Sequence, residues 1–65
     1  NPVASNVIKI IESKGLKQRV IAEKANMTAQ ALCDILNGRR ILKVSEVNNL
    51  AKSLCVEVND LFKTE

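Results

Sequence analysis

The stretch from Gln18 to Gly38 constrains the fold most, because it holds two short helical patterns with almost no chain between them. On both sides of Asn26, apolar residues recur three and four positions apart, as in helices that bury one face. Asn is one of the few residues besides Gly that tolerates a positive φ, so Asn26 can reverse the chain. A glycine then ends the second pattern. The sequence therefore predicts two helices joined by a tight turn, over about residues 18–37.

Three further helices are predicted by the same apolar spacing. They span about residues 3–13, 46–54 and 58–63. Asn1 and Ser45 are the expected N-caps of the first two of these helices, and Gly15 is expected to end the first in the left-handed conformation. With 65 residues, two Gly, one Pro and one aromatic side chain, the chain suits one small aliphatic core packed between helices. The expected fold class is therefore all-α, a compact five-helix single domain over residues 1–65.

Pairs of apolar residues five positions apart mark three helix starts. This is the spacing between the residue before an N-cap and the fourth helical residue, which pack together as a hydrophobic staple. The pairs are Leu16 with Ile21, Met27 with Leu32, and Val56 with Leu61. They predict N-caps at Lys17, Thr28 and Glu57. Thr is a good capping residue and Lys is a poor one.

Composition argues against an enzyme, a metal site and a membrane protein. The chain has two cysteines and no histidine, which removes most hydrolytic triads and zinc sites, so no cofactor is expected. Cys33 and Cys55 are expected to be reduced thiols of a cytoplasmic protein, since disulfide scaffolds of this size carry more cysteines. No apolar run approaches the roughly 20 residues of a membrane span, and no secretion leader is recognisable.

Basic residues concentrate in and beside the two-helix stretch. Residues 17–43 hold six Lys and Arg against two Asp and Glu, whereas the rest of the chain holds four against five. A basic patch on one side of a domain is typical of phosphate binding, although an ordinary solvated surface can have the same composition. Asp60 and Glu65, with the polar Asn59 beside them, keep the C-terminal end acidic, so a phosphate-bearing ligand such as DNA is expected at the opposite end of the molecule.

A larger set of residues stands at the spacings of one known family. Within the two-helix stretch these residues are Gln18, Ala22, Asn26, Met27, Leu32, Ile35 and Asn37-Gly38. Beyond it they are Val47, Leu50, Ala51, Leu54, Val56 and Leu61. They resemble the helix-turn-helix domains of the lambda repressor and Cro proteins, the XRE type, over about residues 3–62. The resemblance implies a lambda repressor-like fold and sequence-specific binding of double-stranded DNA.

The chain departs from that family at three places. Lys17 stands where the family usually has a Ser, Thr or Asn cap. Cys55 stands where Gly commonly ends the fourth helix, so this end is either loosely terminated or holds a left-handed cysteine under strain. Ile11 and Leu36 replace the ion pair that many members form between the first and third helices. None of these departures touches the expected reading surface.

The resemblance places the second helix of the stretch in the DNA major groove. The outward residues expected to read bases are Ala29, Gln30, Cys33 and Asp34. Gln30 can pair bidentately with adenine, and Ala29 can contact a thymine methyl group. Asp34 can accept a hydrogen bond from cytosine or can instead orient Gln30. Plain solvent-exposed surface is the alternative role for Gln30 and Asp34.

The expected interface is completed by phosphate-binding residues and by a second copy of the chain. The phosphate-binding candidates are Lys17, Gln18, Arg19, Thr28, Asn37, Arg39, Arg40, Lys43 and Ser45. One helix reads only a few base pairs, so a homodimer on two half-sites is expected. The candidate dimer-interface residues are Val56, Val58, Leu61 and Phe62.

Three functions compete for this sequence. The first is a phage- or bacterial-type repressor that occupies a palindromic operator. The second is an antitoxin or controller whose main partner is another protein. The third is a protein-interaction module that has lost DNA binding, which the basic residues Arg39, Arg40 and Lys43 disfavour. The first is favoured over the second because the chain lacks a long apolar tail that would hold a toxin.

Overall fold

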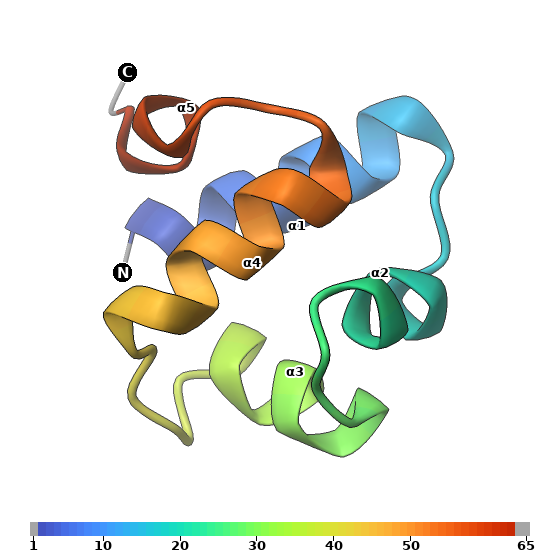
Figure 1. Cartoon of the computed structure of the whole chain (residues 1–65), viewed down its shortest axis with the longest axis vertical. Coiled ribbons are helices and arrows are strands. Elements are labelled where there is room, and N and C mark those ends of the chain that lie inside the picture. The colour runs from blue at the N-terminus through green and yellow to red at the C-terminus, as the bar shows by residue number, and fades with distance from the viewer. Residues whose placement is uncertain (1, 64–65) are drawn as a thin grey trace.

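The computed structural model describes residues 2–63, which form five α-helices around one core (Figure 1). The helices are α1 (Pro2–Lys14), α2 (Gln18–Lys24), α3 (Ala29–Leu36), α4 (Val44–Leu54) and α5 (Val58–Phe62). This arrangement confirms the expected all-α, five-helix fold. Asn1, expected as an N-cap, and Glu65, expected at the acidic end, lie outside the described residues. None of these five helices is long and apolar enough to cross a lipid bilayer.

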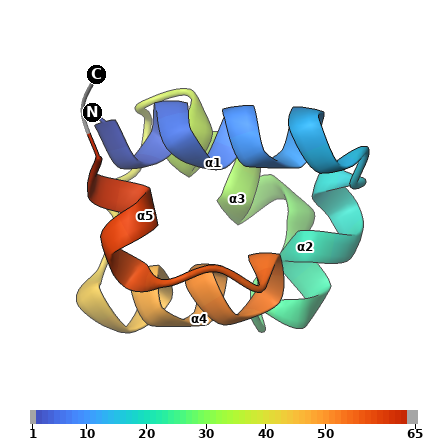
Figure 2. The ribbon, with the colours of Figure 1, turned by 90° about the horizontal axis from the view of Figure 1, so that it is seen from above.

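The helices enclose the core from several sides (Figure 2). α1 and α4 lie on opposite sides of the molecule, α2 closes one end between them, and α5 closes the other. α3 packs against α1 and α2, and α5 packs against α1 and α4. In Figure 1, α3 lies at the lower end of the molecule and α5 at the upper end. The helix expected to read DNA is therefore opposite the acidic residue Asp60, as the charge pattern predicts.

The core is built from aliphatic side chains of all five helices. The largest fully buried ones are Val7, Ile21, Leu32, Ile35, Leu50, Leu54 and Leu61. Each helix contributes one apolar face, and burying a Leu or Ile side chain stabilises a fold by roughly 1.5–3 kcal/mol. Ala22 is also fully buried, and its small side chain lets α2 and α3 pack closely. Leu61 therefore belongs to the core of a single copy. Its role at a dimer interface stays a prediction.

Helices α1 to α4 end in the same way, with one residue in the left-handed conformation. These residues are Gly15 (φ 64°), Asn26 (φ 62°), Gly38 (φ 77°) and Cys55 (φ 59°). In each case this residue and the next donate their N–H groups to carbonyls three and five residues back, which is the Schellman motif. At the turn between α2 and α3, for example, Met27 N–H donates to Ala22 C=O at 3.0 Å. The reversal at Asn26 is confirmed, and of the two alternatives for Cys55 the structure has the left-handed one.

The starts of α2, α3 and α5 lie where the staple pairs predict them. Their N-caps are Lys17, Thr28 and Glu57. Thr28 Oγ1 accepts a hydrogen bond from the Ala31 N–H at 3.0 Å, whereas Lys17 makes no capping bond with its side chain. At the start of α5 the backbone of the N-cap is the donor: the Glu57 N–H donates a hydrogen bond to Asp60 Oδ2 at 3.0 Å. The helical register of α2 and α3 is therefore the predicted one.

The start of α4 differs from the prediction. The helix begins at Val44, so Ser45 lies inside its first turn and is not its N-cap. The N-cap is Lys43, whose backbone N–H donates to Glu46 Oε1 at 3.0 Å. A carboxylate at the third helical position that reaches back in this way is half of a capping box. This contact fixes the start of α4 although Lys is a weaker intrinsic cap than Ser.

Two polar side chains of α1 hold the ends of α4 and α5. Lys14 Nζ donates to the Leu54 C=O at 2.9 Å, at the end of α4 where the helix dipole also favours a cation. Asn6 Nδ2 donates to the Leu61 C=O and to the Lys63 C=O, each at 2.8 Å. These bonds give partners to carbonyls that a helix end leaves unsatisfied.

Candidate nucleic-acid interface

α3 turns one face toward the core and the opposite face toward solvent. Leu32 and Ile35 are buried, so the residues on the other side of the helix point outward. Among these, the exposed residues are Ala29, Gln30 and Asn37, and the half-buried ones are Cys33 and Asp34. The structure thus brings the four predicted base-reading residues onto one face of α3.

Gln30 and Asp34 are joined by a side-chain hydrogen bond across one helical turn. Gln30 Nε2 donates to Asp34 Oδ1 at 3.0 Å. A primary amide has two N–H donors and one carbonyl acceptor, so this bond leaves Gln30 with one donor and its oxygen available. A donor and an acceptor are what a bidentate contact with adenine requires. Asp34 can therefore orient Gln30 without occupying its reading edge.

Two further contacts link the end of α3 to its outward face. Arg39 Nη1 lies 3.8 Å from Asp34 Oδ1, and the Arg39 side chain is 70% exposed. A pair this exposed contributes little stability, so the guanidinium can turn to another anion at small cost. Asn37 Nδ2 donates to Cys33 Sγ at 3.3 Å, and the Cys33 thiol is free. The outward face is therefore a connected set of polar groups.

The predicted phosphate-binding residues lie on both sides of α3. In Figure 1, α2 lies on one side of α3 and the segment that leads to α4 lies on the other. The candidates at the starts of α2 and α3 are Lys17, Gln18, Arg19 and Thr28, all exposed. The exposed candidates after α3 are Asn37, Arg39, Lys43 and Ser45. Basic side chains in both groups provide positive charge where a DNA backbone would run along a groove-bound helix.

Arg40 differs from the other basic residues because it is paired within the protein. Its Nη1 lies 2.9 Å from Glu46 Oε2, and only 35% of its side chain is exposed. The hydrogen bond from the Lys43 backbone N–H and then the Arg40 guanidinium lower the pKa of Glu46, and they outweigh the opposing effect of partial burial. Arg40 thus ties the segment after α3 to the first turn of α4. Its phosphate-binding role stays a prediction, with Glu46 as a competing partner.

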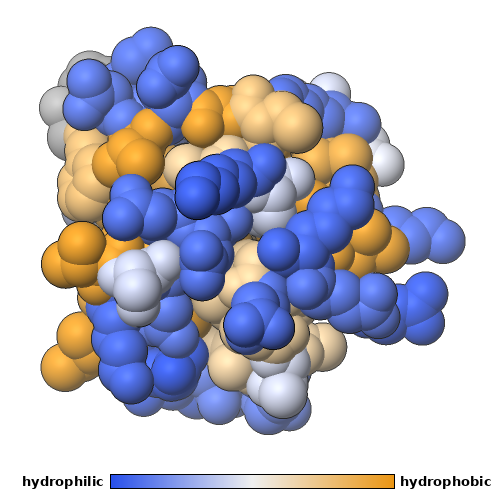
Figure 3. All heavy atoms as spheres, viewed as in Figure 1, coloured by the Kyte–Doolittle hydropathy of each residue, from blue (hydrophilic) through white to orange (hydrophobic). Residues whose placement is uncertain are grey.

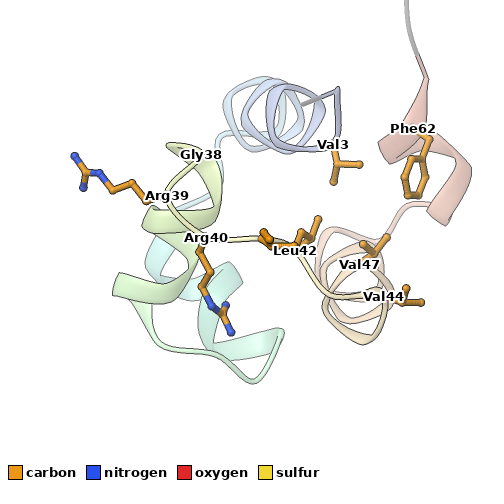
Figure 4. Close-up of a pocket in the computed structure, with 9 residues that line it drawn as sticks. Val3, Gly38, Arg39, Arg40, Leu42, Val44, Val47 and Phe62 are labelled. Atoms are coloured by element: carbon orange, nitrogen blue, oxygen red, sulfur yellow. The ribbon is translucent and has the colours of Figure 1, made fainter.

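The segment between α3 and α4 and the first residue of α4 also expose apolar side chains that the sequence predictions did not include. Ile41 is 88% exposed and Val44 is 80% exposed. With Phe62 of α5, they border a hollow of about 520 Å³ that Val3 and Val47 also line (Figure 4). The exposure of these side chains could have been predicted from the sequence, because Ile41 and Val44 fall outside the apolar stripe predicted for residues 46–54.

Comparison with known proteins agrees with this geometry. Residues 7–61 match a family model described as helix-turn-helix. A comparison with curated proteins gave no match. Among solved structures, the fold is similar to the restriction-modification controller protein C.AhdI from Aeromonas hydrophila, with a TM-score of 0.88 and 21% sequence identity. The superposition covers 94% of this chain and 92% of that one, and at this identity it establishes the fold.

Proposed function

Because this chain belongs to the helix-turn-helix family of DNA-binding regulators, we propose that it is a transcriptional repressor that occupies a palindromic operator as a dimer. In this proposal, α3 of each copy lies in the major groove of one half-site. The observation that carries the proposal is the outward polar face of α3, which has basic residues on both sides. The proposed activity is binding, without a catalytic step or a cofactor, on nucleoid DNA in the cytoplasm.

The length of α3 supports the use of two copies. Its eight residues span about 12 Å at a rise of 1.5 Å each, which is close to the width of one major groove. One copy can therefore read only a few base pairs. Two copies related by a two-fold axis read half-sites about 34 Å apart, or one helical turn. A palindromic operator follows from that symmetry.

We assign the reading of bases chiefly to Gln30. Its available amide donor and acceptor suit adenine N7 and N6, and Asp34 holds the amide in place. Ala29 is exposed at the start of α3 and can meet a thymine methyl group. Cys33 is half-buried on the same face, so it contacts DNA only where the helix sits deep in the groove.

Affinity in this proposal comes mainly from phosphate contacts on both sides of α3. Lys17, Arg19, Arg39 and Lys43 are exposed and basic, and each that neutralises a phosphate releases a counterion. DNA affinity should therefore fall as the salt concentration rises. The slope of log affinity against log salt concentration should be proportional to the number of these phosphate contacts. Thr28 and Asn37 add hydrogen bonds that position the protein without reading sequence.

Selection of bound sequences from a random pool of double-stranded DNA tests the proposal. The expected result is a palindrome with two half-sites whose centres are about one helical turn apart. Each half-site should contain at least one strongly preferred adenine. Folded protein that enriches no sequence after repeated selection contradicts sequence-specific binding, and a non-palindromic site contradicts the symmetric dimer.

A controller whose main partner is another protein is the second candidate. The fold is similar to that of C.AhdI, described as a restriction-modification controller, which supports the controller role in this candidate and not the protein partner. Operator binding by the purified chain alone supports the repressor, whereas operator binding that requires a second, different protein supports this candidate. Gel-shift titration of the operator with the purified chain, with and without a protein extract of the cells that produce it, distinguishes the two.

A further inference from the structure

A second hollow, of about 280 Å³, lies between the end of α1, the helix α2 and the end of α4. Four apolar side chains line it, two of them partly exposed and two almost fully buried: Leu16, Val20, Ile21 and Leu54. Three exposed lysines line it as well: Lys14, Lys17 and Lys24. In Figure 3, hydrophilic side chains project from the side of the molecule where α2 lies, and hydrophobic atoms show between them. We call this site the lysine hollow.

The positive charge of the lysine hollow is not compensated within residues 2–63. None of the described residues that line it is acidic, and its three lysines take no part in the ion pairs found in this part of the chain. The ends of α1 and α4 also border the hollow, and each helix C-terminus carries about −0.5 of a charge. Together they offset roughly one of the three positive charges, so a net attraction for an anion remains.

The walls of the lysine hollow are already formed in the free protein. Lys14 Nζ donates to the Leu54 C=O at 2.9 Å, which ties the end of α1 to the end of α4. This bond uses one of the three N–H donors of the ammonium group, so two are available to a ligand. α2 packs against α4 and closes the other side. A ligand therefore loses little free energy to the ordering of its site.

We propose that the lysine hollow binds a small organic anion, namely a carboxylate that carries a short apolar chain or ring. The ammonium groups attract the carboxylate, and the apolar walls receive the rest of the molecule. The volume of about 280 Å³ lies just below the roughly 300–1,000 Å³ that is usual for drug-sized ligands, so the occupant is small. This site goes beyond the proposed function, because its occupation needs no DNA.

The apolar walls favour such a ligand over an inorganic ion or a DNA phosphate. Leu16 is 37% exposed and is one of the five large apolar side chains that residues 2–63 leave exposed. A bare anion leaves Leu16 and Val20 in contact with water, whereas an apolar chain laid against them removes their surface from water. Charge and apolar surface should therefore both contribute to affinity.

Titration of the full chain with sodium octanoate, followed by nuclear magnetic resonance, tests the proposal. Octanoate is kept below the concentration at which it forms micelles. Saturable shifts should centre on the amides of Leu16, Val20 and Cys55, which all line the lysine hollow. 1-Octanol lacks the charge and acetate lacks the chain, so each should bind at least about tenfold more weakly than octanoate.

Substitution of the lysines gives a second measurement. Lys24→Gln should raise the octanoate dissociation constant by roughly threefold, and the double variant Lys17→Gln, Lys24→Gln by roughly tenfold. Both side chains are exposed, so the variants should keep the melting temperature of the wild type. The matched control for the single variant is Lys52→Gln, at an exposed position of α4 that does not line the hollow. It should change the dissociation constant by less than about twofold.

Three results overturn the proposal. The first is a set of octanoate shifts that do not saturate or that spread evenly over the protein surface. The second is equal affinity for octanoate and for either 1-octanol or acetate, because the charge or the apolar walls then contribute nothing. The third is a double variant that binds octanoate as tightly as the wild type does.

Lys17 belongs both to the lysine hollow and to the predicted phosphate-binding residues. Bound octanoate should therefore weaken DNA binding, and DNA should weaken octanoate binding by the same factor. Fluorescence anisotropy measures this effect, with sodium chloride at the same ionic strength as the control. Only this consequence rests on the proposed function. A chain that binds octanoate but no duplex contradicts the proposed function and supports the lysine hollow, and a chain that binds an operator but no octanoate does the reverse.

Discussion

At the level of single residues, contacts within the protein already order the outward face of α3. Gln30 is bonded to Asp34 at 3.0 Å, and Arg39 lies 3.8 Å from the same carboxylate. A side chain that is held in one orientation loses less conformational entropy when it binds. In the proposed complex, Asp34 would thus contribute to DNA recognition chiefly by holding Gln30 in place.

Gln30→Ala and Arg39→Ala should have different effects on DNA binding. The first removes the proposed base contact, so preference at one position of each half-site should fall by about 1–3 kcal/mol. The second removes a phosphate contact, so all sequences should bind more weakly and the salt slope should fall by about one. Fluorescence anisotropy with matched and mismatched duplexes at several salt concentrations measures both effects.

Lys52→Ala is the matched control for the charge change. It removes one positive charge at an exposed position of α4, outside the basic stretch at 17–43. Its salt slope should equal that of the wild type. Equal losses of affinity for all sequences in both the Gln30 and the Arg39 variants would show that Gln30 does not read a base. Arg40 is a poorer choice for this comparison, because its loss also removes the ion-pair partner of Glu46.

Cys55 is a residue whose replacement should stabilise the protein. It has a φ of 59°, and a left-handed conformation costs a non-glycine residue roughly 1–2 kcal/mol. Gly relieves that strain but gains more freedom in the unfolded chain, so Cys55→Gly should raise the free energy of unfolding by about 0.5–1 kcal/mol. Urea denaturation of the two proteins measures the difference.

Gly15→Ala is the reciprocal experiment at an equivalent helix end. Gly15 has a φ of 64°, and no atom lies within 4 Å of the position that a Cβ would take. The substitution should therefore lower the free energy of unfolding by about 1 kcal/mol through backbone strain alone. A Cys55→Gly variant that is less stable than the wild type would show that the cysteine side chain makes a favourable contact that outweighs the strain.

At the level of helices, the start of α4 depends on the charge of Glu46. The pKa of this carboxyl is lowered by the Lys43 N–H and by Arg40, so the charged form stabilises the folded state. This stabilisation is complete above the ordinary pKa of 4.5 and is lost as the pH falls through the lower folded-state value. Glu46→Gln should therefore cost about 1 kcal/mol at neutral pH, and the cost should shrink below pH 4.5.

Chemical denaturation of both proteins across the acid range checks this prediction. Glu12→Gln, at an exposed position of α1, makes the same chemical change away from α4 and serves as the control. If the free energies of unfolding of Glu46→Gln and wild type differ by the same amount from neutral to acid pH, the effect comes from altered side-chain packing or hydrogen bonding and not from the charge of Glu46.

Most helix boundaries could be predicted because local chemistry sets them. Apolar spacing located the buried faces, and Asn26 and Gly38 marked reversals that few other residues tolerate. The start of α4 could not be predicted in the same way, because Ser45 is the better intrinsic cap and the deciding contact comes from Glu46. A side chain in the first turn of a helix can thus decide where the helix starts, even when another residue nearby is the better intrinsic N-cap.

The candidate site was predictable only in part. The outward face of α3 follows from helical periodicity, but the pairing of Arg40 with Glu46 depends on how the intervening chain folds back. The exposure of Ile41 and Val44 was missed for a similar reason. Ile41 and Leu42 are adjacent in sequence, yet Leu42 packs against the core and Ile41 is 88% exposed. Which of two neighbouring apolar residues is exposed is decided by tertiary packing, since both have the same local signal.

At the level of the whole molecule, Asn6 joins the two ends of the described chain. Its two hydrogen bonds hold α5, a helix of five residues that is too short to be stable alone. Asn6→Ala should lower the free energy of unfolding by about 1–2 kcal/mol, or the melting temperature by about 5–10 °C. Thermal denaturation followed by circular dichroism measures this loss.

Ser5→Ala is the control for this prediction, because Ser5 is the exposed neighbour of Asn6 on α1. It should change the free energy of unfolding by less than about 0.5 kcal/mol. An Asn6→Ala variant that melts like the Ser5→Ala variant would show that apolar packing alone holds α5 in place.

The Schellman ends of α1 to α4 have a consequence for the order in which the chain folds. Each reversal forms between residues a few positions apart, and helical proteins dominated by such near contacts fold in microseconds to milliseconds. We therefore expect rapid refolding in a stopped-flow experiment, with α2 and α3 among the first elements to form. The contact between α1 and α5 joins segments from opposite ends of the chain, so it should form last. A molecule that has just formed α3 would then still lack the contact that joins its two ends.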